Sequence, residues 1–236
     1  MENDIRLVIF DFDGTLADTA ATILSTYRAA IAALGLPERT DAECRATIGL
    51  PLREGFRALF PDAAEELLDR CVDTYRDIFQ ANKARLRPRL YPGVKETLEA
   101  LRGAGMEMSI ASSRNRESLC EFCRENGIDG YFSLVLGADD VVHAKPDPEP
   151  VEITLNRLCY RPSEAVVVGD MPVDIAMGLG AGCPTVGVSY GNSTASALAA
   201  AGAAAVIDRI ALLPATISNI SGCEFIKRQL GKPVEG

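Results

Sequence analysis

The stretch LVIFDFDGT, residues 7–15, places a short apolar run directly before two aspartates that stand one residue apart. Like charges this close repel, and their proximity costs free energy unless a cation or a partner group compensates it. The stretch therefore either ends at the surface or forms part of a site. Residues 7–10 have the length and apolar character of a buried β-strand, and Gly14 and Thr15 follow the aspartates.

Beyond Pro88 the sequence alternates short apolar runs with amphipathic segments. Strands are predicted at MEMSIASS (106–113), SLVLG (133–137), EAVVVGD (164–170), PTVGVS (184–189) and AAVI (204–207). Helices are predicted at YPGVKETLEALRGAG (91–105), NRESLCEFCRENGI (115–128), PEPVEITLNRLCY (148–160), PVDIAMGLGAG (172–182) and ASALAAAG (195–202). This alternation predicts an α/β fold with a parallel sheet that helices cover on both faces.

The segment between these two regions is predicted to be entirely helical. One helix runs from Ala17 to about Leu34 and ends at Gly35, and more helices follow between residues 41 and 81, with Asp41 and Asp62 as N-caps. We therefore expect a core of residues 1–16 and 87–236, and a small helical cap domain of residues 17–86. The insertion point puts the cap over the carboxyl end of the first strand, where open parallel sheets bind ligands.

Composition narrows the class of protein. The chain has 236 residues, a formal net charge of −9 and a sequence pI of about 4.8, which argues against a nucleic-acid partner. No apolar run has the length of a transmembrane helix, and the N-terminus does not resemble a signal peptide, so we expect a cytoplasmic protein without a membrane partner. Seven scattered cysteines favour reduced thiols, and the pair Cys120 and Cys123 favours helix packing over zinc or redox chemistry.

Polar clusters follow the carboxyl ends of the predicted strands. A parallel sheet brings these ends together, and the cluster members are Asp11 and Asp13, Ser112-Ser113-Arg114, Lys145, and Asp170 with Asp174. Several carboxylates near one point repel unless a hard cation binds between them, and Mg²⁺ prefers oxygen ligands. We expect Asp11, Asp170 and the backbone carbonyl of Asp13 as Mg²⁺ ligands, with Asp174 in a supporting or water-mediated role.

The same cluster predicts phosphoryl-transfer chemistry. An aspartate can attack phosphorus directly, and a second carboxylate can protonate the leaving oxygen and then activate water. Asp11 and Asp13 fit these two roles, because residues two apart on an extended chain point the same way. Lys145 and Ser112 are expected to neutralise and position the phosphoryl group.

Four motifs, DFDGT, Ser112, Lys145 in KPDPEP, and GDMPVD, together resemble the haloacid dehalogenase superfamily in its phosphatase branch. The resemblance implies a Rossmann-like core, a four-helix cap and Mg²⁺-dependent transfer through an aspartyl-phosphate. It also favours phosphate-ester cleavage, since the dehalogenases lack the second acid that Asp13 supplies. We expect Gly14, Thr15, Ser113 and Arg114 at the substrate's phosphate, although a loop role without substrate contact fits Ser113, and a solvated helix start fits Arg114, equally well.

The cap loop suggests the substrate. TIGLPLREGF (47–56) and GVSYG (187–191) resemble segments of phosphoglycolate phosphatases, and Arg53 and Arg57 could meet an anionic substrate or lie on solvated helix faces. The expected partner is a small phosphorylated metabolite, with phosphoglycolate first. A pyrophosphatase, a β-phosphoglucomutase and a catalytically silent binding module stay open, whereas the absence of lysine between Ala17 and Asn82 argues against a phosphonoacetaldehyde hydrolase.

The sequence leaves the oligomeric state and the role of one loop open. The chain is either a monomer or a homodimer. Tyr190-Gly191-Asn192 either line the site entrance or form a turn, and the single histidine, His143, is expected to be a loop residue.

Overall fold

The fold is built on a parallel β-sheet, as predicted. The structure is a computed structural model that describes residues 4–82 and 88–221. Its sheet has six strands in the order β5-β4-β1-β6-β7-β8, and every ladder is parallel. The strands are β1 (Leu7–Phe10), β4 (Glu107–Ala111), β5 (Leu134–Leu136), β6 (Ala165–Gly169), β7 (Thr185–Val188) and β8 (Ala205–Ile207). The predicted α/β class is therefore confirmed, and the first strand lies inside the sheet.

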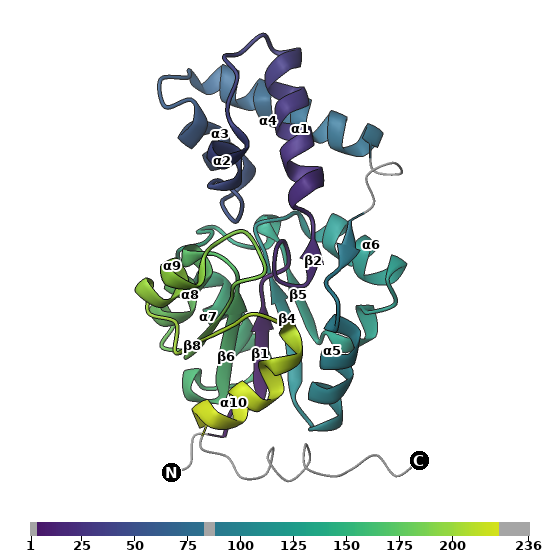
Figure 1. Ribbon diagram of the computed structural model, residues 1–236, viewed down its shortest axis with the longest axis vertical. Helices are drawn as coiled ribbons and strands as arrows, with labels where there is room; N and C mark the ends of the chain where they lie inside the picture. The colour runs from purple at the N-terminus through teal and green to yellow at the C-terminus, as the bar shows by residue number, and fades with distance from the viewer. Residues whose placement is uncertain (1–3, 83–87, 222–236) are drawn as a thin grey trace.

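Helices cover both faces of the sheet (Figure 1). One face carries α5 (Val94–Gly103), α6 (Arg116–Glu125) and α10 (Leu213–Ser221), and the other carries α7 (Glu149–Leu158), α8 (Pro172–Gly180) and α9 (Ala195–Ala200). Val8 and Phe10 belong to the apolar cluster of the first face, whereas Leu7 and Ile9 belong to that of the second. Because side chains alternate along a strand, burial on both faces requires the uninterrupted apolar run that the sequence shows.

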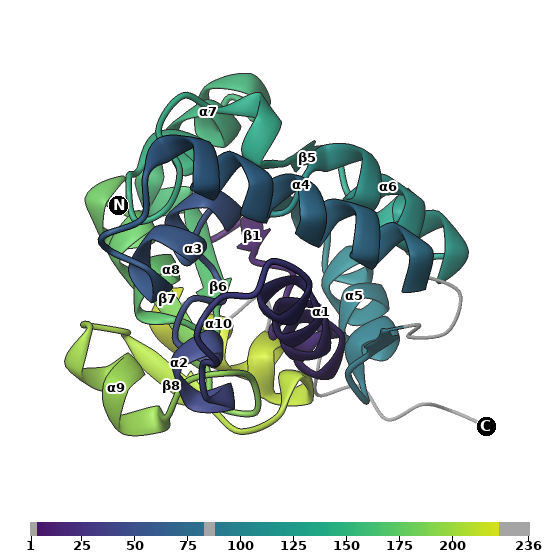
Figure 2. The same ribbon diagram turned by 90° about the horizontal axis from the view of Figure 1, so that it is seen from above.

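Four further helices form a unit beyond the carboxyl ends of the strands, which we call the cap. They are α1 (Ala20–Ala33), α2 (Asp41–Arg45), α3 (Leu52–Leu59) and α4 (Glu65–Asn82), and Figure 2 looks down on them with β1 underneath. The cap has its own apolar cluster, in which the ring of Tyr27 lies 5.0 Å from the rings of both Phe56 and Tyr75, measured between centroids. Burying one large apolar side chain contributes about 1.5–3 kcal/mol, so this cluster contributes to the stability of the cap.

A short two-stranded stem joins the cap to the sheet. β2 (Ala17–Asp18) pairs antiparallel with β3 (Arg89–Leu90), one strand on each chain crossing. The division into residues 1–16, 17–86 and 87–236 stays a prediction, and its second boundary lies outside the described residues. Four short 3-10 helices complete the described elements: η1 (Asp129–Tyr131), η2 (Ala138–Asp140), η3 (Pro162–Glu164) and η4 (Ile210–Leu212).

The structure corrects some predicted element boundaries. The first cap helix begins at Ala20 and not at Ala17, because residues 17–18 pair with β3. The prediction of Asp41 as an N-cap is wrong, since Thr40 takes that position and its side chain accepts a hydrogen bond from the Glu43 N–H. Helix α4 begins at Glu65, three residues after the predicted cap at Asp62, and α10 had no predicted counterpart. Within residues 4–82 and 88–221, we find no helix whose length and apolar character would let it cross a membrane.

Candidate active site

The carboxyl ends of three neighbouring strands bring the predicted site residues together. Asp11 follows β1, Ser112 follows β4 and Asp170 follows β6, and these strands are adjacent in the sheet. All three side chains are buried. The parallel topology therefore gathers residues that are up to 159 positions apart, from Asp11 to Asp170, at one edge of the sheet.

Three carboxylates and one ammonium form the centre of the site. Asp11, Asp170 and Asp174 each place a carboxylate oxygen within 4.8 Å of the others. Lys145, only 3% exposed, donates hydrogen bonds from Nζ to Asp11 Oδ1 at 2.5 Å and to Asp174 Oδ1 at 2.7 Å. When all three carboxylates are ionised, the single ammonium leaves two negative charges without compensation in this cluster.

The pKa values of the cluster reflect this excess of negative charge. Burial raises the pKa of Asp11 to about 7, although Lys145 opposes the rise, and Asp174 adds to it. Burial and the carboxylates of Asp11 and Asp174 hold the pKa of Asp170 well above its ordinary value. Burial would lower the pKa of Lys145, but the two carboxylates that it contacts outweigh burial and raise it. The site thus favours binding of a positive charge next to Asp11 and Asp170.

The donor set fits a hard divalent cation. Buried carboxylate oxygens from separate elements, converging within 4.8 Å, are the ligands that Mg²⁺ and similar ions prefer. Both oxygens of Asp174 are already occupied, because Oδ1 accepts a hydrogen bond from Lys145 at 2.7 Å and Oδ2 accepts the N–H of Met171 at 3.0 Å. Its predicted supporting role is consistent with these contacts, and its part in metal binding stays a prediction.

The orientation of Asp170 depends on Asn192, in the loop after β7. Asp170 Oδ2 accepts the backbone N–H of Asn192 at 2.7 Å and its side-chain amide at 2.9 Å, and Thr15 Oγ1 lies 3.3 Å from Asp170 Oδ1. From the cap, Arg45 donates to Asn192 Oδ1 at 3.0 Å. The sequence is compatible with Asn192 at the site entrance or in a turn; in the structure it holds Asp170, and Thr15 contributes to the same support.

Gly14 lets the chain turn tightly beneath Asp170. It adopts a φ of +93°, and a Cβ at this position would lie 2.1 Å from Asp170 Oδ2. No other residue type fits this close approach without displacing the carboxylate. The expectation that Gly14 binds the phosphate stays a prediction, while its place in the site is clear.

The second aspartate of the opening stretch has different neighbours from the first. Asp13 accepts two hydrogen bonds from Arg114, from Nε at 3.1 Å and from Nη2 at 2.6 Å. The side chains of Asp13 and Arg114 are only 15% and 11% exposed. The sequence does not predict this pair, since it is compatible with Arg114 as a phosphate ligand or at a solvated helix start. Asp13 therefore lies beside the three-carboxylate cluster with a cationic partner of its own.

The two serines before Arg114 face different parts of the site. Ser112 is buried, and its Oγ accepts the backbone N–H of Arg114 at 3.2 Å. Ser113 donates from Oγ to the backbone carbonyl of Gly49 in the cap at 2.6 Å. Ser113 is thus a contact between the sheet domain and the cap, and its predicted substrate contact stays untested.

A cavity of about 570 Å³ lies between the cap and the strand ends. Asp11, Asp13, Ser112 and Arg114 line it from the sheet side. The cap side is mostly apolar and aromatic, lined by Ile23, Tyr27, Ile48, Leu50, Leu52, Val72, Tyr75 and Phe79, with the polar side chains Arg53, Asp69, Arg76 and Gln80. Such a concave space above convergent polar groups is typical of a site for a small molecule.

Of the two predicted cap arginines, only Arg53 lines the cavity. Its guanidinium is already bound by carboxylates of the cap, to Glu65 at 2.5 Å and to Asp69. Arg57 binds the same Glu65 at 2.8 Å and is not part of the cavity lining. The predicted substrate contact of Arg53 requires an exchange of these partners and stays a prediction.

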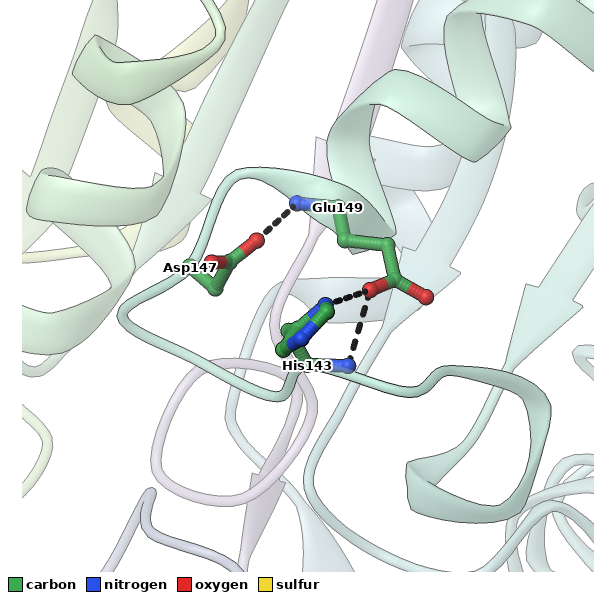
Figure 3. Close-up of side chains that lie close together, drawn as sticks. All are labelled: His143, Asp147 and Glu149. Atoms are coloured by element: carbon green, nitrogen blue, oxygen red, sulfur yellow. Dashed lines mark hydrogen bonds and ion pairs between the residues drawn. The ribbon is translucent and has the colours of Figure 1, made fainter.

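A second group of potential metal ligands lies in the loop around Lys145. His143, Asp147 and Glu149 approach one another within 4.8 Å (Figure 3). Glu149 accepts the backbone N–H groups of Val142 and His143 at 2.7 and 2.8 Å, and its Oε2 lies 2.7 Å from His143 Nδ1. Through these hydrogen bonds, the Glu149 carboxylate stabilises the loop that carries Lys145. His143 is an exposed loop residue, as expected.

Comparison with known proteins places this arrangement in a family. The family model for haloacid dehalogenase-like hydrolases matches residues 8–188, which include β1, the cap and the residues of the site. The chain is 36% identical to the protein named "Probable phosphatase IndB" of Dickeya dadantii over 92% of this chain and 99% of the relative. It is 36% identical to pyrophosphatase PpaX of Halalkalibacterium halodurans over 79% and 85%, and 30% identical to phosphoglycolate phosphatase of Vibrio vulnificus over 90% and 96%.

Solved structures show the same fold. A haloacid dehalogenase-like protein from Bacteroides fragilis matches with a TM-score of 0.81 at 29% identity, over 89% of this chain and all of that one. The fold and site define a hydrolase with a Rossmann-like core and a buried carboxylate cluster at the strand ends. The chain belongs to the haloacid dehalogenase-like hydrolase family, and within it to the phosphatases, which are phosphoric monoester hydrolases.

Proposed function

We propose that the protein is a Mg²⁺-dependent phosphatase that hydrolyses a small phosphorylated metabolite through an aspartyl-phosphate. The observation that supports this most is the position of Asp11. Its buried carboxylate faces the cavity, 2.5 Å from the Lys145 ammonium and within 4.8 Å of Asp170. A carboxylate with one oxygen held by a fixed cation is oriented for attack by the other.

In the first step, an oxygen of Asp11 attacks phosphorus and the bond from phosphorus to the leaving oxygen breaks. Asp13, which enters this step protonated, gives its proton to that oxygen, so that the product leaves as an alcohol. In the second step, Asp13 takes a proton from water as the water oxygen attacks phosphorus, and Asp11 is released together with inorganic phosphate. Lys145 and Ser112 stabilise the charge on the phosphoryl oxygens in both steps.

Mg²⁺ would be held by Asp11 and Asp170, with the Asp13 carbonyl and Asp174 as the predicted additional groups. When bound, it would neutralise the negative charge that otherwise repels a phosphate from this site. The support for this assignment is the donor set itself, which has two negative charges in excess of Lys145 when fully ionised.

Phosphoglycolate is the first substrate that we propose. The support is the cap loop of residues 47–56 and the relative from Vibrio vulnificus that is named phosphoglycolate phosphatase. Pyrophosphate is the second candidate, because a relative of 36% identity is named pyrophosphatase PpaX. Both molecules carry a second anionic group, which Arg53 could bind from the cap side of the cavity.

The test is phosphate release from a panel of phosphoglycolate, pyrophosphate, sugar phosphates and nucleotides, each with Mg²⁺ and with EDTA. Asp11→Asn serves as the control for contaminating phosphatases. We expect Mg²⁺-dependent release with a clear preference for phosphoglycolate. Release from no member of the panel would refute the proposed function, whereas a preference for pyrophosphate would replace only the substrate.

A further inference from the structure

The pair formed by Asp13 and Arg114 raises a question about proton transfer. Both oxygens of Asp13 accept hydrogen bonds from the guanidinium, at 2.6 and 3.1 Å, in a nearly buried location on the cavity wall. A bidentate pair of this kind fixes the carboxylate in one plane and one direction. The direction of Asp13, and hence its reach toward a leaving oxygen, is thus set by the place of Arg114.

Arg114 is itself held from three sides. Its third guanidinium nitrogen donates to Ser118 Oγ on α6 at 3.2 Å. The guanidinium carbon lies 5.4 Å from the centroid of Phe12 in the sheet domain and 5.4 Å from that of Phe79 on the cap helix α4. Stacking of arginine on aromatic faces is favourable, and more so when both groups are shielded from water.

Phe79 is the member of this arrangement that belongs to the cap. It comes from α4, whose neighbouring turns also contribute Val72, Tyr75 and Arg76 to the cavity lining. A displacement of α4 relative to the sheet would therefore change one of the two aromatic faces of Arg114. Asp13 would follow, because Arg114 holds both of its oxygens.

We propose that Arg114 is a positioning residue for Asp13 and that Phe79 ties this pair to the cap. Arg114 fixes the orientation of the Asp13 carboxylate, and the contact with the ring of Phe79 makes this orientation depend on the position of the cap. The inference rests on the proposed function, because it assigns Arg114 to the proton transfer that Asp13 carries out there.

The role predicts a dependence on the leaving group. An alkyl phosphate such as phosphoglycolate needs a proton on its leaving oxygen, whereas p-nitrophenolate is a stable anion that leaves p-nitrophenyl phosphate without one. The ratio kcat/KM reports the first, phosphorus–oxygen bond-breaking step. A residue that only supports folding, or only binds phosphate, would change kcat/KM for both esters alike.

The experiment compares kcat/KM for the two esters in wild type, Phe79→Leu, Arg114→Gln and Arg114→Lys, with Mg²⁺. We expect Phe79→Leu to lower the value for the alkyl ester about tenfold and Arg114→Gln about 100-fold, while the aryl ester changes less than about threefold. Arg114→Lys should recover part of the loss, because it keeps the charge but not the bidentate geometry.

Phe60→Leu is the matched control. Phe60 is also a cap phenylalanine with an arginine over its ring, since the guanidinium carbon of Arg39 lies 4.5 Å from its centroid, but it is not part of the cavity lining. In Phe60→Leu, the ratio of kcat/KM between the two esters should stay as in wild type.

Equal losses of kcat/KM for both esters, or no loss, in the Phe79 and Arg114 variants would overturn the inference but not the proposed phosphatase function. An inactive wild-type enzyme would refute the proposed function and this inference with it.

Discussion

The strand edge and the cap contain similar charged groups in different surroundings. At the strand edge, Lys145 and its two carboxylate partners are at most 5% exposed in their side chains. In the cap, Arg28 and Asp41 form an ion pair of 2.7 Å with side chains that are 56% and 53% exposed. Water screens the second pair more strongly than the first. The difference indicates that charged side chains interact strongly at the sheet edge, whereas the ion pair of the cap adds little and its apolar cluster contributes more to its stability.

The largest expected effect concerns the chemistry of the sheet edge. Asp11→Asn keeps the size of the side chain but removes the nucleophilic oxygen pair, so kcat should fall by about 10³-fold or more. Phosphate release with Mg²⁺ measures this, and circular dichroism checks that the variant is folded. A variant that keeps more than a tenth of the wild-type rate would exclude Asp11 as the nucleophile and leave the strand edge with a binding role.

The next effect compares the two ion pairs directly. Lys145→Met leaves Asp11 and Asp174 buried without their cation, and we expect the free energy of unfolding to fall by about 3–5 kcal/mol. Arg28→Met, in the exposed pair, should change it by less than about 1 kcal/mol. Urea unfolding of both variants without metal gives the two values. Equal values would mean that burial does not separate the two regions as the structure indicates.

A third effect follows from the raised pKa of Asp11. Its folded-state pKa is about 7 against an ordinary value of 3.8, so the folded protein binds a proton more tightly than the unfolded chain does. The contribution of this group to stability is complete below pH 3.8 and is lost as the pH rises through about 7. In EDTA, the melting temperature of the wild type should fall more between pH 3.8 and about 7 than that of Asp11→Asn does.

Mg²⁺ should oppose that decline, because a ligand that binds only the folded state stabilises it by about 2.7 kcal/mol at 100 times its dissociation constant. Melting curves at pH 5 and pH 8, with EDTA and with Mg²⁺, measure both effects. Asp170→Asn is the control, in which Mg²⁺ should no longer raise the melting temperature. Stabilisation of that variant as strong as in wild type would place the cation away from the strand edge.

The same contrast explains how much the sequence could predict. Strand β1 has the predicted limits, because a strand that is buried on both faces requires apolar side chains at all four consecutive positions. The parallel topology brings Asp11 and Asp170 together, and Lys145, in the segment after β5, reaches Asp11 from there. Site residues that lie at the carboxyl ends of parallel strands can therefore be predicted from the sequence.

Pairings that depend on side-chain placement were not predicted. Asp13 and Arg114 are 101 residues apart, and nothing local distinguishes an arginine that binds an aspartate from one that binds a phosphate. The stem of β2 and β3 has only two residues in each strand, which is too short for a hydrophobic period to show. Helix α10 begins with LPATIS, in which proline, β-branched residues and serine weaken the helical signal.

The smallest effect concerns selection by the cap. Arg53 and Arg57 lie on the same helix, α3, and both bind Glu65, but only Arg53 lines the cavity. To bind an anionic group of the substrate, Arg53 has to exchange the carboxylates of Glu65 and Asp69 for it, so the net gain in binding free energy is modest.

We expect Arg53→Gln to raise KM for phosphoglycolate about tenfold, or about 1.4 kcal/mol, with kcat nearly unchanged. Arg57→Gln loses the same type of bond to Glu65 away from the cavity, so its KM should stay within about twofold of wild type. Initial-rate measurements on both variants separate the two arginines. Equal shifts in KM would assign the effect to the stability of α3, whereas a shift for Arg53 alone would show that the cap, despite its internal ion pairs, contributes a cation to substrate recognition.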